Sequence, residues 1–272
     1  MNKSESVIYQ QEGHIGSIIL NRSEKRNAFN TESWSALLDA VTQAEQDREA
    51  RVILIKGAGK SFCAGLDLSQ ENEMVQVLRQ PLSTESKLIF YRMVRHIQDT
   101  YSRLERLTRP TIAVIQSHCL GAGLELVLCC DIRLCDAGAE FSLPEARVGF
   151  ITDLGGLQRL PRVVGPGKAR EIAYRAHRFG AAQALEMGLV NQVFSTREEL
   201  EEGALRMAQE IATNPPLCVQ GAKEVFLYQE RLNLEESLDY TAARSSMIVP
   251  SEDMREAMEA FVQKREPHLK GK

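Results

Sequence analysis

The chain has 272 residues, of which 43% are hydrophobic and 26% are charged, and its formal net charge is −4. This composition is typical of a folded globular protein and excludes disordered, collagen-like and disulfide-scaffold classes. The slight negative charge supplies no basic surface of the kind that nucleic acid requires, so we expect no nucleic-acid partner. The six cysteines form no C-x-x-C pair and no zinc-ligand pattern. We therefore expect no metal site and interpret the cysteines as packing residues in a reducing compartment.

The first eleven residues contain no apolar segment of the secretory type, and no run of eighteen apolar residues occurs anywhere in the chain. These two observations predict a cytoplasmic protein without a membrane span.

Short apolar segments alternate with longer helical stretches through the first two thirds of the chain, a pattern that indicates an α/β fold. Strands are expected at 16–20, 52–56, 111–116, 131–135, 140–142 and 189–194. Helices are expected at 31–47, 87–108, 121–130, 165–176 and 181–187, and residues 70–86 are expected to form a flap with some helix.

Strand patterns stop near residue 195, and four helices are expected after it, at 198–213, 217–231, 234–247 and 251–264. The composition therefore divides the chain into an α/β core over 1–195 and a helical region over 196–272. The helical region packs on its own core or on a neighbouring subunit, and the pattern alone allows both.

Two familiar motifs are incomplete. The segment 57–61 (GAGKS) resembles the end of a phosphate-binding loop, but Leu54 stands where the motif requires glycine. Ser117 and His118 suggest a serine hydrolase, yet G-x-S-x-G is absent and side chains of sequence neighbours rarely point at each other. We expect neither activity and interpret His118 as an ordinary loop residue.

Two glycine-bearing turns follow apolar strands, at 61–68 (SFCAGLDL) and 117–125 (SHCLGAGLE). Small residues allow a ligand to approach the main chain, and the free N–H groups at the start of a helix favour a developing oxyanion. Two such turns on adjacent strands can hold one carbonyl oxygen between two donors.

Three acidic residues lie in apolar surroundings near these turns. Glu125 lies in the segment GAGLELVLCC, Glu145 follows a proline in FSLPEARVGF, and Asp153 lies in ITDLGGLQRLP. Burial keeps a carboxyl group protonated near neutral pH, so such a cluster can supply both an acid and a base. Beside an oxyanion hole, the cluster indicates proton transfer next to a carbonyl group. A buried salt bridge is the alternative interpretation of Glu125.

At these residues the sequence resembles the crotonase superfamily of enoyl-CoA hydratases and isomerases, from about Ser17 to Lys264. The resemblance rests on the segments NRSEKRNAFN (21–30), GAGKSFCAGLDL (57–68), HCLGAGLELVLCCDIRLC (118–135), FSLPEARVGFITDLGGLQRLPRVVG (141–165) and EMGLVNQVF (186–194). It implies a spiral of ββα units, a C-terminal helical region that assembles a homotrimer or a dimer of trimers, and an acyl-CoA thioester substrate. It also implies that the backbone N–H groups of Leu66 and Ala122 form the oxyanion hole. Coenzyme A is part of the substrate, so no separate cofactor is expected.

The resemblance leaves the reaction open. Glu125 and Glu145 match the two catalytic glutamates of the hydratases, and we rank hydration first because that pair is chemically sufficient. Asp153 stands where hydratases usually carry glycine and where Δ3,5-Δ2,4-dienoyl-CoA isomerases carry aspartate, so isomerisation by Glu145 and Asp153 is the alternative, although those isomerases usually have aspartate at position 125. Further alternatives are a synthase of cis-2-unsaturated fatty-acid signals, a thioesterase and a non-catalytic binding module.

The resemblance also implies contacts with coenzyme A. Residues near the pantetheine and phosphates would be Lys25, Arg26 and Ala28, and residues near the adenine would be Ala64, Asp67 and Leu68. Phe261 and Lys264 match residues that reach the coenzyme A of a neighbouring subunit. Ser69 stands where many hydratases carry a phosphate-binding lysine.

Overall fold

The protein is described here by a computed structural model that covers residues 6–80 and 83–272. Residues 1–5, at the start of the N-terminal segment, and residues 81–82, within the expected flap, lie outside the described part. At the centre is a six-stranded sheet in which the first two strands are antiparallel and all later neighbours are parallel. In spatial order the strands are β1 (Val7–Glu12), β2 (Ile15–Leu20), β3 (Val52–Gly57), β4 (Thr111–Ile115), β6 (Ile132–Asp136) and β9 (Gln192–Phe194).

A second, three-stranded sheet lies beside the first. It contains β5 (His118–Leu120), β7 (Glu140–Ser142) and β8 (Phe179–Gly180), with β7 in the middle. Because β5 follows β4 after only two residues, the chain passes directly from the large sheet into the small one. The second glycine-bearing segment, 117–125, begins in this turn and continues through β5 into α4 (Ala122–Val127).

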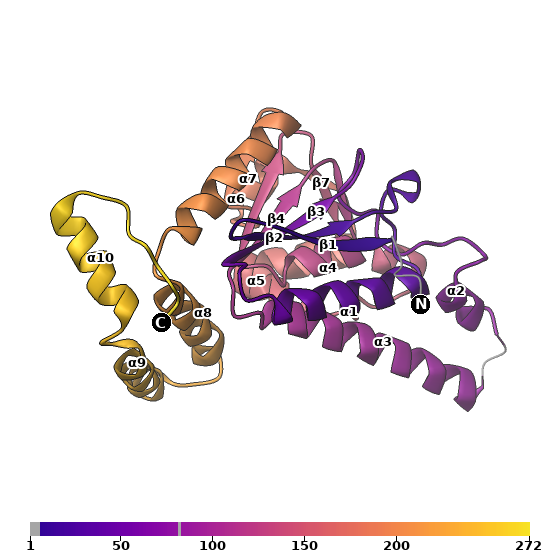
Figure 1. Cartoon of the computed structure of the whole chain (residues 1–272). Coiled ribbons are helices and arrows are strands. Elements are labelled where there is room, and N and C mark those ends of the chain that lie inside the picture. The colour runs from indigo at the N-terminus through magenta and orange to yellow at the C-terminus, as the bar shows by residue number, and fades with distance from the viewer. Residues whose placement is uncertain (1–5, 81–82) are drawn as a thin grey trace.

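Helices cover both faces of the large sheet (Figure 1). On one face lie α1 (Thr31–Gln46), α3 (Thr84–Glu105), α4 (Ala122–Val127) and α5 (Gly156–Arg175). On the other face lies α7 (Arg197–Ala212), whose Leu200, Ala204 and Ala208 pack on β3, β4 and β6. Shorter helices are η1 (Ser23–Lys25), α2 (Glu73–Leu78), η2 (Glu145–Val148) and α6 (Ala181–Glu186).

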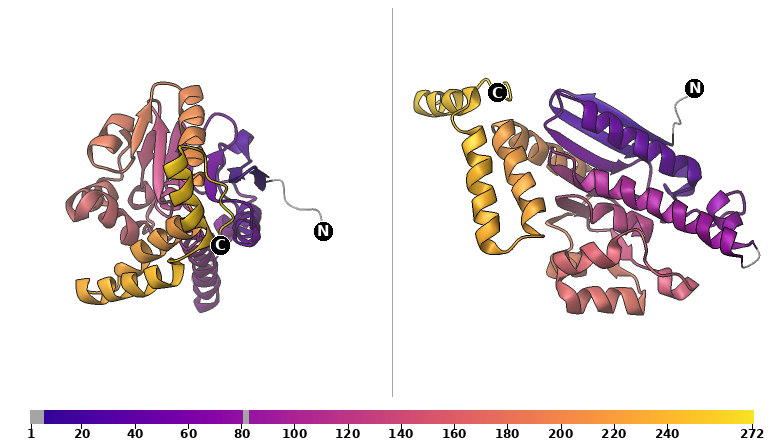
Figure 2. Two further views of the ribbon diagram at one scale, coloured as in Figure 1. Left: turned by 60° about the vertical axis from the view of Figure 1, so that its left-hand side comes forward. Right: turned by 90° about the horizontal axis from the view of Figure 1, so that it is seen from below.

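The remaining helices form an arm that extends from the core (Figure 2). The arm contains α8 (Pro216–Gln229), α9 (Leu234–Ile248) and α10 (Glu252–Gln263). Its base is held by buried Lys223, whose ammonium group donates to Asp131 Oδ2 at 2.7 Å and to the carbonyl oxygen of Arg109 at 3.0 Å. Large apolar side chains on the arm are exposed, including Phe226, Leu234, Leu238, Met247, Phe261 and Val262.

The structure confirms the α/β expectation and places most of the expected elements within a few residues. Three strands were missed: β1, which carries the half-polar sequence VIYQQE, β5, which was expected to be loop, and the two-residue β8. The helix expected at 165–176 begins at Gly156 and is interrupted at Gly165, whose φ of +78° is not helical. Of the helices expected after residue 196, α7 covers the sheet and only the last three form the arm.

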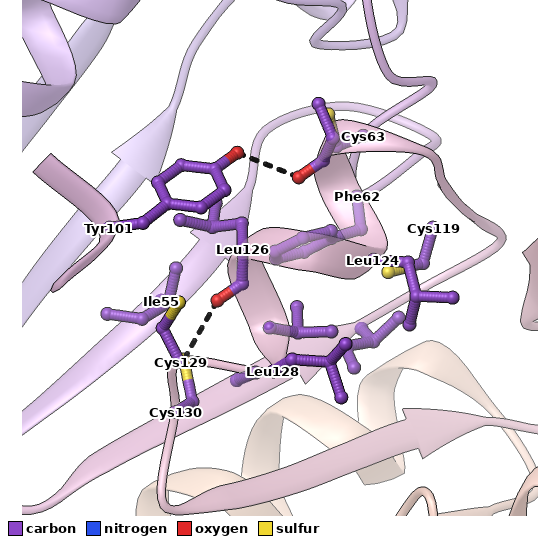
Figure 3. Close-up of a cluster of buried hydrophobic side chains, with 14 of the residues drawn as sticks. Ile55, Phe62, Cys63, Tyr101, Cys119, Leu124, Leu126, Leu128, Cys129 and Cys130 are labelled. Carbon is purple, nitrogen blue, oxygen red and sulfur yellow. Dashed lines mark hydrogen bonds between the residues drawn. The ribbon is translucent and has the colours of Figure 1, made fainter. Parts of the chain in front are cut away.

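Five of the six cysteines are buried, and Cys218 on α8 is exposed. Figure 3 shows four of the buried thiols among the apolar side chains between the large sheet and α4. Burial raises the pKa of Cys63 to about 12, so this thiol remains protonated at neutral pH. No helix within the described ranges is long and apolar enough to cross a membrane.

Candidate active site

The two glycine-bearing turns lie side by side because backbone hydrogen bonds join them. The N–H of Cys63 donates to the carbonyl oxygen of His118 at 2.8 Å, and the N–H of Leu120 donates to that of Cys63 at 3.0 Å. Gly65 adopts φ +93°, a left-handed conformation that favours glycine. A Cβ atom at Gly65 would lie 3.0 Å from the carbonyl oxygen of Leu120 and 3.8 Å from the nitrogen of Ala122. The first turn therefore approaches the second at the residues that carry the expected donors.

Leu66 and Ala122 each present a free backbone N–H group at the place where the two turns approach each other. Phe29 pairs with the first turn by donating to the carbonyl oxygen of Gly65 at 2.7 Å and accepting from the N–H of Asp67 at 2.8 Å. This pairing leaves the N–H of Leu66 directed away from Phe29. Ala122 is the first residue of α4, where N–H groups have no partner inside the helix. Within residues 6–80 and 83–272, neither N–H group donates to another protein atom, so both are available to a bound carbonyl oxygen.

Glu125 lies one turn further along α4 and is 2% exposed. Its Oε2 atom accepts the N–H groups of Leu154 at 3.0 Å and Gly156 at 2.7 Å. The pKa of Glu125 is raised to about 8, chiefly by burial and also by the negative charges of Glu145 and Asp153, while the two N–H groups oppose the shift. Glu125 is therefore mostly protonated at neutral pH. The alternative interpretation of Glu125 as half of a buried salt bridge is wrong, because its partners are backbone groups.

Glu145 and Asp153 complete a cluster of three carboxyl groups. Glu145 begins η2, and its Oε2 atom accepts the hydroxyl of Thr152 at 3.1 Å. Its Oε1 atom lies so close to Gly121 that a Cβ there would be only 2.8 Å away, which places the carboxyl group beside the Ala122 donor. Burial raises the pKa of both Glu145 and Asp153, and the charge of Asp153 raises that of Glu145 further. The three acids that the sequence singled out are thus brought together next to the two N–H donors.

Most of the residues expected near coenzyme A lie together around the first turn. The segment carrying Lys25, Arg26 and Ala28 contacts the segment carrying Ala64, through a hydrogen bond of 3.0 Å from the N–H of Ala64 to the carbonyl oxygen of Arg26. Lys25, Arg26 and Leu68 are exposed, and Ala28 and Asp67 are buried. Phe261 and Lys264 lie apart from this group, at the end of α10 on the arm (Figure 1).

Asp67 is held by a residue that the sequence analysis missed. The Arg22 guanidinium lies 3.0 Å from Asp67 Oδ2, and both side chains are largely buried. Burial raises the pKa of Asp67, but the N–H of Ser69 and the Arg22 guanidinium outweigh this effect and hold the pKa below its usual range. Asp67 is therefore ionised and fixes the loop after the first turn.

The expectation that Ser117 and His118 do not face each other is wrong. Ser117 Oγ lies 3.0 Å from His118 Nδ1, and Ser61 Oγ lies 3.1 Å from the same atom. Ser117 adopts φ +51°, and this backbone conformation turns its side chain toward the imidazole ring of His118. Ser61 is 3% exposed, and Glu140 Oε2 lies 3.9 Å from His118 Nε2, too far for a hydrogen bond, so the group lacks the hydrogen-bonded serine–histidine–carboxylate arrangement of a hydrolase.

Two backbone N–H groups beside three carboxyl groups of raised pKa, on a sheet with helices over both faces, are the groups that an enzyme needs to move protons next to a carbonyl group. The model of the enoyl-CoA hydratase/isomerase family matches residues 10–272. The chain belongs to that family and has its crotonase fold.

The proteins similar to this chain include dienoyl-CoA isomerases and enoyl-CoA hydratases. The peroxisomal Δ3,5-Δ2,4-dienoyl-CoA isomerase of Arabidopsis thaliana is 35% identical over 256 residues, which cover 93% of this chain and 91% of that protein. The short-chain-enoyl-CoA hydratase of Clostridium acetobutylicum is 31% identical, with 96% of this chain and 95% of the relative covered. The crystal structure of an enoyl-CoA hydratase from Bacillus anthracis superposes with a TM-score of 0.89 at 32% identity, over 98% of this chain and all of that chain.

Proposed function

We propose that the protein is a Δ3,5-Δ2,4-dienoyl-CoA isomerase. The observation that carries the proposal is the place of Asp153 in the carboxyl cluster, where burial raises its pKa above the usual range for aspartate. Glu125, by contrast, is held by two backbone N–H groups and is kept neutral by burial. Glu145 and Asp153 are therefore the two acids best able to exchange protons with a substrate. The names of the dienoyl isomerases among the relatives support the same assignment.

The proposed reaction moves one proton along the acyl chain. The thioester oxygen binds between the N–H groups of Leu66 and Ala122. One carboxylate of the pair Glu145 and Asp153 removes a proton from C2, and the electrons delocalise through the two double bonds onto the thioester oxygen. The other carboxyl group then donates a proton to C6, which leaves double bonds at C2 and C4. Each positioned proton transfer contributes about 10²–10⁴ to the rate, and each oxyanion donor about 10²–10³.

Hydration of a trans-2-enoyl-CoA is the second candidate. It is favoured by the presence of both Glu125 and Glu145 in the same cluster, since a neutral acid and a carboxylate are what the addition of water requires.

Conversion of 3,5-dienoyl-CoA and hydration of trans-2-enoyl-CoA, measured on wild type and on Glu125→Gln, Glu145→Gln and Asp153→Asn, separate the two reactions. For the isomerase we expect Asp153→Asn to lower kcat on the diene by about 10²-fold or more, because one proton transfer is lost. Dominant hydration that survives Asp153→Asn and is lost in Glu125→Gln would establish the hydratase instead. Absence of turnover of any enoyl-, dienoyl- or 3-hydroxyacyl-CoA would leave the binding-module alternative.

The assembly is also a proposal. We infer that the arm mediates a homotrimer or a dimer of trimers, because its exposed apolar side chains, such as Phe226 and Leu238, lack cover within the described chain. In this assembly Phe261 and Lys264 would reach the coenzyme A site of a neighbouring subunit. Light scattering should give three or six times the chain mass of 30.5 kDa, and a monomer would refute this assignment.

A further inference from the structure

One face of α3 carries polar side chains that all contact the elements around the active site. The side chains belong to Gln98, Tyr101, Ser102 and Glu105, a spacing that places them on the same side of a helix. None of them is among the residues assigned to substrate or coenzyme A above. Their partners lie on α4, on the loop after Thr152 and at the start of α5.

Tyr101 anchors the helix that carries the oxyanion donor. Its buried hydroxyl donates to the carbonyl oxygen of Ala122 at 2.8 Å, and Figure 3 shows this hydrogen bond as the dashed line that starts at the labelled Tyr101. This helix, α4, has only six residues, and its N-cap, Gly121, has no side chain to cap it. Such a short uncapped helix depends on tertiary contacts, because isolated helices of this length are unstable, and all six of its residues are buried. The Tyr101 hydroxyl therefore supplies an external anchor for both the Ala122 N–H and Glu125.

Gln98 and Glu105 anchor the loop that carries Asp153 and the N–H groups that bind Glu125. The Gln98 amide donates to the carbonyl oxygen of Asp153. Glu105 accepts two hydrogen bonds from Arg159, at 2.9 and 2.8 Å. The Arg159 guanidinium packs so closely under Gly155 that a Cβ there would lie 2.0 Å from its Nη1 atom. Gly155 stands between the two residues whose N–H groups bind Glu125.

We propose that the polar face of α3 is a positioning element, which sets the oxyanion donor at Ala122 and the 153–156 loop, with its acid Asp153, at a defined separation. The inference rests on the proposed function, since it assigns a catalytic purpose to that separation. Small displacements matter, because shifts of about 1 Å in a reacting group cost roughly 10²-fold in rate. The four side chains act through backbone groups and through Arg159, so they are positioning residues and not catalytic ones.

The test compares Tyr101→Phe and Gln98→Leu with Tyr91→Phe. Tyr91 lies on the same helix, but its side chain is exposed and contributes nothing to the polar face, so its variant controls for loss of a hydroxyl from α3. We expect both test variants to lower kcat on 3,5-dienoyl-CoA about tenfold with KM changed less than threefold, and the control to match wild type. Thermal melting establishes that each variant is folded.

A second measurement distinguishes positioning from simple loss of stability. Hexanoyl-CoA offers a carbonyl oxygen to the two N–H donors, whereas S-hexyl-CoA does not, so wild type should bind the thioester roughly tenfold more tightly. Tyr101→Phe should reduce this preference to about threefold, because the Ala122 N–H is displaced. Gln98→Leu should keep the full preference while losing rate, because it displaces Asp153 and not the donor.

Each outcome bears on the inference. An unchanged thioester preference in folded Tyr101→Phe, or a kcat of Gln98→Leu equal to that of the control, would overturn it while leaving the proposed function intact. Wild type that shows no thioester preference and no turnover would refute the proposed function, and the inference would fall with it.

Discussion

Replacement of Glu125 by glutamine should make the protein more stable at alkaline pH. Glutamine has the same shape as protonated glutamic acid, and its side-chain oxygen can still accept the N–H groups of Leu154 and Gly156. Unlike an ionised glutamate, glutamine carries no charge that must be buried. In wild type the carboxyl group must ionise inside the protein as the pH rises, and burial opposes this.

The size of the effect follows from the pKa. Folding raises the pKa of Glu125 from 4.5 to about 8. Between these values the folded state binds more protons than the unfolded state, so the free energy of unfolding falls as the pH rises. The slope approaches about 1.4 kcal/mol per pH unit, and the accumulated loss near pH 8 to 9 is about 5 kcal/mol. Glu125→Gln removes this loss. Below pH 4.5 both proteins carry a neutral side chain, and the difference between them should be small.

Urea unfolding at pH 5, 7 and 9, at one protein concentration, measures the difference between wild type and Glu125→Gln. Contributions from the other titrating groups are largely common to both proteins and cancel in that difference. Glu186→Gln, at an exposed glutamate on α6, controls for loss of a negative charge. A difference between wild type and Glu125→Gln that stays constant from pH 5 to 9 would refute the assignment of a buried, mostly neutral Glu125.

Three further substitutions test other parts of the structure. Gly156→Ala places a methyl group 2.9 Å from Glu125 Oε2 and should lower kcat about 10- to 100-fold, with the far-UV spectrum unchanged. Arg22→Ala leaves Asp67 buried without its cation and should lower the free energy of unfolding by about 3 kcal/mol in urea at pH 7. Because the ion pair lowers the pKa of Asp67, this loss should vanish as the pH falls below 3.8 and Asp67 becomes protonated. Lys223→Met removes the ion pair at the base of the arm and should cost about 2 kcal/mol, with faster proteolysis of α8; unchanged cleavage would contradict this role.

The features predicted well from the sequence are those with a local signature. The apolar runs of β3 and β4 identify buried parallel strands, because such strands are apolar on both faces. The glycines of the two turns and the acids in apolar segments identify the site, since each departs from the composition around it. For these glycines and acids, the residue type alone indicates a ligand-binding turn or a group that transfers protons.

The features that were missed depend on partners distant in sequence. Glu125 is held by N–H groups 29 and 31 residues away, and a backbone donor leaves no trace in the residue type. Tyr101 and Gln98 look like ordinary residues of an amphipathic helix until the structure shows which backbone groups they contact. β1 was missed because an edge strand with one face in water has no continuous apolar run.

The distribution of the thiols allows the protein to be labelled with a dye at a single cysteine. Five thiols are buried, and burial raises the pKa values of Cys63, Cys130 and Cys135 to about 12, so almost none of these groups is a reactive thiolate at neutral pH. Cys218 alone among the six is exposed. A maleimide dye should therefore attach once per chain, on α8, without any engineered cysteine. Energy transfer between dyes on mixed donor- and acceptor-labelled chains would then report subunit exchange through the arm in real time.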